Sequence, residues 1–149
     1  MEVTGYGIAQ RFVGLKEVNG LASNPQILAM LRLDGSWPRT DEVPWCSAFV
    51  NYVAWLLRLP RSKSLGARSW LAVGRPIASR DAEAAFDVVV LQRGGANQPG
   101  PDVIAAPGHV GFFAGMEADR VLVLGGNQGD AVSLESFPAS RILGIRRLT

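Results

Sequence analysis

The sequence predicts a single α+β domain, with helices in its N-terminal half and an antiparallel β-sheet in its C-terminal half. Two observations support this prediction. Apolar residues recur at helical spacing in the first half, whereas the second half holds short β-branched runs separated by glycine-rich turns. Helices followed by a run of strands are typical of α+β domains. The length of 149 residues suits one domain and leaves little room for a second.

Start and stop signals locate the helices. Asn24 and Pro25 begin one of them, because Asn24 can accept hydrogen bonds from free backbone N–H groups and Pro25 has no N–H to leave unpaired. Pro60 ends the clearest one. The expected helices span 8–15, the segment from Asn24-Pro25, 46–58 and a short stretch within 64–73.

Short apolar runs with turn residues between them locate the strands. The tight connections predict an antiparallel meander, in which each strand pairs with the next. The expected strands span 86–92, 110–115, 121–125, 131–134 and 142–147, with loops at 34–44 and 93–108.

The composition excludes several classes of protein. The net charge is +2, and lysine and arginine are scattered without a basic stripe, which argues against a nucleic-acid partner. No apolar run reaches the roughly 18 residues that a membrane span needs. With one cysteine and one histidine, the chain forms no internal disulfide and no Cys/His zinc cluster.

Cys46 is the first candidate for chemistry, because it follows Pro44-Trp45 and opens the helix expected at 46–58. A thiol at the start of a helix faces unpaired N–H groups and the positive end of the helix dipole, and both favour the nucleophilic thiolate. The alternative is an inert core cysteine, since free cysteine is among the most buried residue types.

His109 is the second candidate, at the point where a glycine-rich loop enters a strand. A lone histidine is usually structural or merely exposed. A cysteine nucleophile, however, needs a base that takes its proton and later protonates the leaving amine. Since His109 is the single histidine, it is the expected base for Cys46.

Asn127 is expected to orient that base. A hairpin centred near Ala118 places His109 opposite Asn127 and Phe113 opposite Val123, and opposed residues share one face of a sheet. An Asn side-chain oxygen can then accept from one imidazole nitrogen and aim the other at Cys46. The alternative is that the glycine-rich segment around Asn127 is only a turn. A slip of the register by one residue would move its side chain to the other face.

The segments around Cys46, His109 and Asn127 resemble the CHAP and NlpC-like cysteine amidohydrolases, a papain-like superfamily that acts on peptidoglycan. They resemble most of all a compact phage-endolysin type. The resemblance implies a fold in which the catalytic helix, behind other N-terminal helices, packs on a C-terminal antiparallel β-sheet. It also implies Cys46 as nucleophile, His109 as base and Asn127 as the orienting group, with no cofactor. The matching segments are GLKEVNG (14–20), NP (24–25), DEVPWCSAFVN (41–51), GHVGF (108–112) and LGGNQ (124–128).

Other residues are expected to contact the substrate or shape its cleft, namely Trp45, Asp41, Glu42 and Gln128. Trp55 is expected in the core instead. Where many CHAP domains carry a glutamate two residues before the Asn127 position, this chain has Gly125.

Metal binding is not expected. Some CHAP domains bind calcium, but the acidic residues Asp34, Asp41 and Glu42 match no calcium loop. We therefore interpret them as a solvated acidic loop.

The expected activity is hydrolysis of an amide in the murein stem peptide, or at its junction with muramic acid, through an acyl-enzyme. The expected partner is peptidoglycan. We expect the protein to be a monomer that does not insert into a membrane and has no separate wall-binding domain. Residues 1–10 show no signal peptide, so we expect synthesis in the bacterial host cytoplasm and action in the periplasm or cell wall after holin- or secretion-dependent release. Three alternatives stay open: an antibacterial secreted effector, a papain-like protease or transferase on protein amides, and a catalytically dead wall-binding module.

Overall fold

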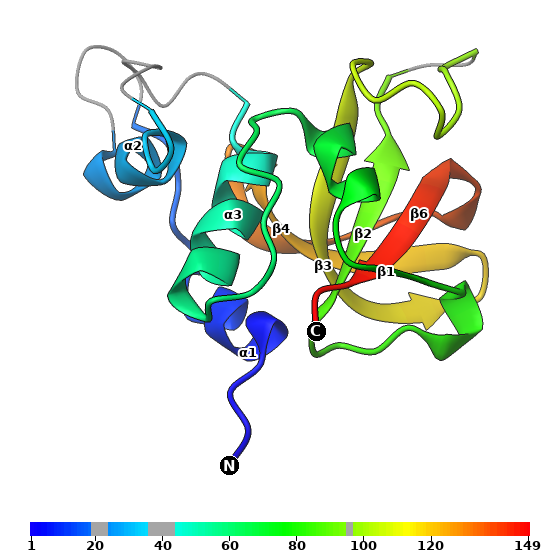
Figure 1. Ribbon diagram of the computed structural model, residues 1–149, viewed down its shortest axis with the longest axis horizontal. Helices are drawn as coiled ribbons and strands as arrows, with labels where there is room; N and C mark the ends of the chain where they lie inside the picture. Colours follow the sequence, from blue (N-terminus) through cyan, green and yellow to red (C-terminus); the bar gives the residue numbers. More distant parts are fainter. Residues whose placement is uncertain (19–23, 36–43, 95–96) are drawn as a thin grey trace.

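The computed structural model describes residues 1–18, 24–35, 44–94 and 97–149, and over these residues an antiparallel sheet carries helices on one side. Figure 1 shows the helices gathered to the left of the sheet, with the two chain ends on the same side of the molecule. The helices are α1 (Gly5–Gln10), α2 (Pro25–Leu31) and α3 (Cys46–Leu56), followed by the 3₁₀ helix η1 (Ala67–Ala72).

Helix α1 lies earlier in the chain than the helix expected at 8–15. It begins at Gly5 because the Thr4 side chain accepts a hydrogen bond from the Gly7 backbone N–H at 3.0 Å. It stops after Gln10 because the chain then turns toward the sheet, and the Gly14 backbone N–H donates to the carbonyl of Val132. The sequence expectation was therefore wrong about the start and the end of this helix.

The next two helices agree with their start signals. Asn24 caps α2 and accepts from the backbone N–H groups of Gln26 and Ile27. Helix α3 begins at Cys46 as expected but ends at Leu56, because Arg58 adopts the left-handed conformation with φ 56°. None of the helices in the described ranges is long and apolar enough to cross a membrane.

The sheet contains six strands within the described residues, in the spatial order β1-β6-β2-β3-β4-β5. The strands are β1 (Arg75–Ile77), β2 (Asp87–Gln92), β3 (Gly108–Glu117), β4 (Arg120–Gln128), β5 (Ala131–Pro138) and β6 (Ile142–Arg147), with short 3₁₀ turns η2 (Ser79–Asp81) and η3 (Ala139–Arg141) between some of them. Strands β2 to β5 form the expected meander. Strand β6 does not continue it, because it returns to pair with β2 on the far side. The sequence analysis missed β1, which pairs with β6.

The hairpin of β3 and β4 has the expected register at its centre, since Phe113 lies opposite Val123. Its turn is shorter than expected. The strands continue to Glu117 and Arg120, and Ala118 takes a left-handed conformation with φ 54° between them. This hairpin brings the segments that contain His109 and Asn127 close together.

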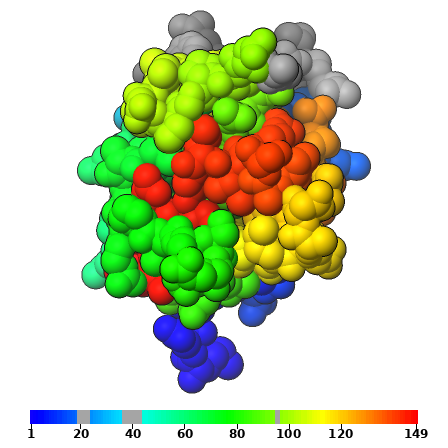
Figure 2. All heavy atoms as spheres, turned by 90° about the vertical axis from the view of Figure 1, so that its right-hand side faces the viewer, coloured from blue at the N-terminus to red at the C-terminus, as the bar shows by residue number. Residues whose placement is uncertain are grey.

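Both faces of the sheet are buried, which explains why β2 is an almost continuous apolar run rather than an alternating one. Val88 and Val90 belong to the main core between the sheet and the helices, whereas Val89 and Leu91 belong to a second apolar cluster on the other face. Figure 2 shows the molecule from this second side, with the C-terminal residues in red lying between the green segment that includes η2 and the yellow tip of the β3–β4 hairpin.

Helix α3 is seated directly on strand β4 at Gly126. A Cβ atom at this position would lie 2.6 Å from Trp45 Cζ3 and 2.9 Å from Phe49 Cβ. Both of those side chains are fully buried. Only a residue without a side chain therefore allows the start of α3 to approach the sheet this closely.

We predict that Gly126→Ala lowers the free energy of unfolding by about 1–3 kcal/mol, the usual cost of overpacking a closely packed core. The midpoint of urea unfolding, with the slope unchanged, measures the effect. Gly35→Ala is the matched control, because a Cβ there meets nothing within 4 Å. Equal midpoints for the two variants would show that Gly126 does not limit the packing of α3.

Candidate active site

Cys46 and His109 meet at the junction between helix and sheet. Cys46 is the first residue of α3, and His109 is the second residue of β3. The two side chains interact with each other, and each moves the pKa of the other, while the backbone N–H of Val110 also acts on the thiol. Both residues are buried, with exposed fractions of 2% for Cys46 and 7% for His109.

The imidazole of His109 is held on its other side by Gln128. His109 Nε2 lies 2.9 Å from Gln128 Oε1. The amide nitrogen of Gln128 donates to the carbonyl oxygens of Val123 at 3.2 Å and Ser133 at 2.7 Å, so its oxygen is the end that faces the ring. An amide oxygen only accepts, and Nε2 must therefore carry the proton. This leaves Nδ1 as the nitrogen that can take a proton from Cys46.

The pKa values of the two groups move toward a thiolate–imidazolium pair. Burial by itself raises the pKa of the Cys46 thiol, but the hydrogen bond and charge of His109, the Val110 N–H and the Arg93 charge outweigh it. The pKa of Cys46 is therefore below its ordinary value. Burial likewise lowers the pKa of His109, but its contacts with Cys46 and Gln128 outweigh burial, and the pKa of His109 lies above its ordinary value.

The orienting residue is Gln128 rather than Asn127, which corrects the sequence expectation. Strand β4 carries a bulge between Gly125 and Gln128, where it has one residue more than β5 opposite. Asn127 lies in this bulge in the left-handed conformation, with φ 57°. The extra residue shifts the alternation of side chains by one, so that the Gln128 side chain lies on the same face of the sheet as the His109 side chain. Gly125 leaves room for it, since a Cβ there would lie 2.7 Å from Gln128 Oε1.

The other three predicted substrate contacts are Trp45, Asp41 and Glu42. Trp45 is fully buried, and its Nε1 donates to Glu17 Oε1 at 2.6 Å, so the expectation that it lines the cleft was wrong. A tryptophan beside a nucleophile can serve as a cleft wall or as an anchor for the helix, and only the packing distinguishes the two. Asp41 and Glu42 lie outside the described residues.

Buried polar side chains fix the start of α3, and the sequence analysis did not identify Ser47 among them. The Ser47 hydroxyl donates to the carbonyl of Ser64 at 2.6 Å and accepts from Trp70 Nε1 at 2.9 Å. One turn later, the amide of Asn51 donates to the Ser64 carbonyl at 3.2 Å and accepts from the backbone N–H of Lys63 at 3.0 Å. These bonds hold the segment from Lys63 to Ser64 in place. They thereby also position the residues directly after Ser64, which line the cleft beside Cys46.

Arg68 is a second supporting residue, and no sequence pattern indicated it. It is completely buried, and its guanidinium donates to the carbonyls of Pro107 at 2.9 Å and Gly100 at 2.7 Å. A Cβ at Gly108 would lie 2.9 Å from Arg68 Cγ. Arg68 thus holds the loop that leads into His109, although an arginine in a short helix normally indicates a surface position.

Two hollows open beside the pair. One, of ≈ 230 Å³, contains Cys46. The other, of ≈ 300 Å³, contains His109 together with Asn127 and Gln128. Arg93 lines both of them. The Cys46–His109 pair therefore lies between two open spaces.

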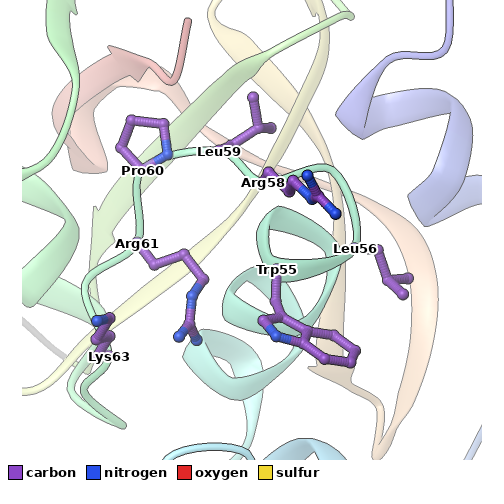
Figure 3. Close-up of a pocket in the computed structure, with 7 residues that line it drawn as sticks. All are labelled: Trp55, Leu56, Arg58, Leu59, Pro60, Arg61 and Lys63. Atoms are coloured by element: carbon purple, nitrogen blue, oxygen red, sulfur yellow. The ribbon is translucent and has the colours of Figure 1, made fainter.

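A third hollow, of ≈ 700 Å³, lies at the other end of α3, and neither Cys46 nor His109 lines it. Figure 3 shows its lining, with the Trp55 indole to the right of the Arg61 side chain and Pro60 and Leu59 above both. Trp55 is about half exposed, at 49%, so the expectation that it belongs to the core was wrong.

The described residues contain no group of three or more His, Cys, Asp or Glu side chains that could hold a metal ion. Asp34, one of the acidic residues considered for a cation, instead forms a two-pronged ion pair with Arg61 at 3.0 Å.

We predict that Cys46 reacts with iodoacetamide well below pH 8.5, the approximate pKa of an ordinary thiol. His109→Ala removes the largest of the interactions that lower the pKa of Cys46 but leaves burial, which raises it, so the reactivity profile moves to higher pH. Because Cys46 is the single cysteine, mass spectrometry of the intact protein reports on it alone. Circular dichroism checks that the variant is folded. A wild-type profile that rises only near pH 8.5 would contradict the ion pair.

We predict that Gln128→Leu lowers the pKa of His109, because the hydrogen bond from His109 to Gln128 is one of the contacts that raise it. NMR titration of the single histidine measures this pKa directly. Asn127→Gly is the matched control, since glycine adopts the left-handed conformation of Asn127 without strain. A larger shift in the Asn127 variant than in the Gln128 variant would overturn the assignment of the orienting residue.

Comparison with known proteins bears on the fold. No protein-family model matches the sequence, and no curated protein matches it either. Among solved structures, NlpC1 from Trichomonas vaginalis is similar with a TM-score of 0.57 and 17% sequence identity. The match covers 97% of this chain and 42% of that protein, so this chain spans less than half of its length.

At this identity the similarity shows the fold alone. It supports the NlpC-like part of the resemblance and gives no support to the CHAP or phage-endolysin part. The chain has an α+β fold of the papain-like, NlpC type, in which the helix that begins with Cys46 packs on the antiparallel sheet that carries His109.

Proposed function

We propose that this protein is a cysteine hydrolase that cleaves an amide bond of peptidoglycan through an acyl-enzyme on Cys46. The observation that carries the proposal is the buried Cys46–His109 pair, whose proton positions are set by Gln128. The sequence motifs around both residues resemble peptidoglycan amidohydrolases, and the NlpC-like fold agrees with that resemblance.

In the acylation step, the Cys46 thiolate attacks the carbonyl carbon of the scissile amide and forms a C–S bond. The backbone N–H of Cys46, at the start of α3, is the natural donor to the oxyanion that develops. When the C–N bond breaks, His109 gives its Nδ1 proton to the leaving nitrogen, and an amine departs. Gln128 keeps the ring in place during this transfer.

In the deacylation step, His109 takes a proton from water as the water oxygen attacks the thioester carbonyl. The C–S bond then breaks, which releases a carboxylic acid and restores the thiolate. The protein supplies every group in this cycle from its own side chains and backbone.

The site favours an amide over a glycosidic bond. Cleavage of a glycan requires two carboxyl groups on either side of the sugar linkage. Among the described residues that line the two hollows, Glu135 is the only carboxylate. A nucleophilic thiolate forms an acyl-enzyme and therefore needs a carbonyl substrate.

Within peptidoglycan we propose the stem peptide as the substrate, following the NlpC-like resemblance rather than the amide at muramic acid. The same chemistry suits a phage lysin released by a holin and an antibacterial effector released by a secretion machine. It also suits a protease or transferase on protein amides, so the substrate must be tested directly.

We predict that the wild-type protein releases soluble fragments from purified sacculi, with new amino termini on stem-peptide residues. Cys46→Ala should lower the rate by about a thousandfold or more, as loss of a catalytic nucleophile does in other enzymes. Mass spectrometry of the fragments identifies the bond, and thermal unfolding confirms that the variant is folded. Denatured casein serves as the control for general proteolysis. Reducing sugar ends without new amino groups, or clearing by a folded Cys46→Ala variant, would refute the proposal.

A further inference from the structure

Arg93 occupies a special position beside the proposed catalytic pair. It directly follows Gln92, the last residue of β2, and it lines both the hollow that contains Cys46 and the hollow that contains His109. Its charge acts on both members of the pair, since it lowers the pKa of Cys46 and also lowers the pKa of His109. A cation at this point attracts any negative charge that enters the cleft.

The positive charge of Arg93 is not paired within the part of the chain that the structure describes. There, the side-chain ion pairs involve Arg61, Arg80 and Arg147, and Arg93 takes part in none of them. The residue is exposed rather than folded onto a carboxylate. Among the described residues, no carboxylate therefore occupies the donors of its guanidinium.

The two hollows differ in chemistry. The one around Cys46 is lined, apart from Arg93, by small and apolar residues, which are Pro44, Leu65, Gly66, Ala67, Ala105, Ala106, Pro107 and Gly108. The one around His109 holds a second cation, Arg141, whose guanidinium donates to the carbonyl of Gln92 and lies 5.9 Å from the centre of the Phe137 ring. With Arg93, Arg141 and Glu135, this second hollow has a positive balance of charge.

The reaction assigns a side of the substrate to each hollow. The acyl group stays bonded to Cys46, so it belongs to the small apolar hollow. The leaving nitrogen must receive its proton from His109, so the amine part belongs to the charged hollow. Arg93 lines both hollows and so lies at the boundary between them.

We propose that Arg93 is a specificity residue that binds a carboxylate on the amine side of the scissile amide. This inference rests on the proposed hydrolase function and defines its substrate class. The enzyme would prefer an amide whose nitrogen belongs to an amino acid with a free carboxylate close to that nitrogen, and whose acyl side is small and uncharged. Guanidinium and carboxylate match in a two-pronged hydrogen-bonded pair, which fixes the orientation of the substrate.

The first test needs no knowledge of the natural substrate. Iodoacetate and iodoacetamide alkylate Cys46 by the same reaction, but only iodoacetate carries a carboxylate. The ratio of their rate constants cancels the fraction of thiolate and reports the attraction of a carboxylate to the site. Cys46 is the single cysteine, so the ratio belongs to this site alone.

We expect Arg93→Gln to lower this ratio about threefold or more, the effect of one unit charge a few ångströms away in a watery site. Arg93→Lys should keep most of the ratio, and 1 M salt should reduce it in the wild type. Arg80→Gln, which removes an exposed arginine that lines neither hollow, is the matched control. An unchanged ratio in Arg93→Gln would overturn the inference, whether or not the protein hydrolyses peptidoglycan.

The second test uses a pair of stem-peptide fragments that differ only in the carboxylate beside the scissile nitrogen, free in one and amidated in the other. We expect wild-type kcat/KM to be at least tenfold higher for the free acid, and Arg93→Gln to lose most of this preference through KM. Equal kcat/KM for the two fragments would refute the role of Arg93. Cleavage of neither fragment by the wild type would instead count against the proposed function, while the alkylation ratio still decides the anion site.

Discussion

The interaction between Cys46 and His109 is the one on which the site depends, and it exists because a helix and a strand meet at their starting residues. Burial opposes charge on both groups, as it raises the pKa of Cys46 and lowers that of His109. The interaction between the two residues reverses both pKa shifts, because the negative thiolate and the positive imidazolium lie beside each other. Since burial disfavours each charge alone, a thiolate and an imidazolium at this depth stabilise each other as a pair, which requires α3 and β3 to stay together.

The approach of helix to sheet depends on glycines with close neighbours. Gly126 lets Trp45 and Phe49 press the start of α3 onto β4. Gly108 gives Arg68 the space to hold the loop that enters β3. Each glycine therefore sets the position of one half of the pair, the first acting on Cys46 through α3 and the second on His109 through its strand.

A single extra residue in β4 determines how the base is oriented. Because of the bulge before Gln128, the Gln128 side chain and not that of Asn127 lies on the face of His109. The longer Gln128 side chain reaches the imidazole of His109 from within the sheet. Backbone carbonyls of Val123 and Ser133 hold its amide so that the oxygen faces His109. The orientation of the base is thereby built into the hydrogen bonding of the sheet rather than left to a mobile loop.

The amino-acid sequence predicts the α+β class, the helix that begins at Cys46 and the core strands, because these follow from local periodicity, caps and turn residues. It also identified the Cys46–His109 pair, since the chain has one residue of each type. Contacts between distant residues decide that Gln128, rather than Asn127, lies against His109 and that Trp45 is buried. The first depends on a bulge and the second on a packing contact, and neither has a local signal. The sequence did not predict the return of β6 to β2 or the position of Arg93 between two hollows. Both depend on long-range pairing, which leaves no periodic signal in the strands that it joins.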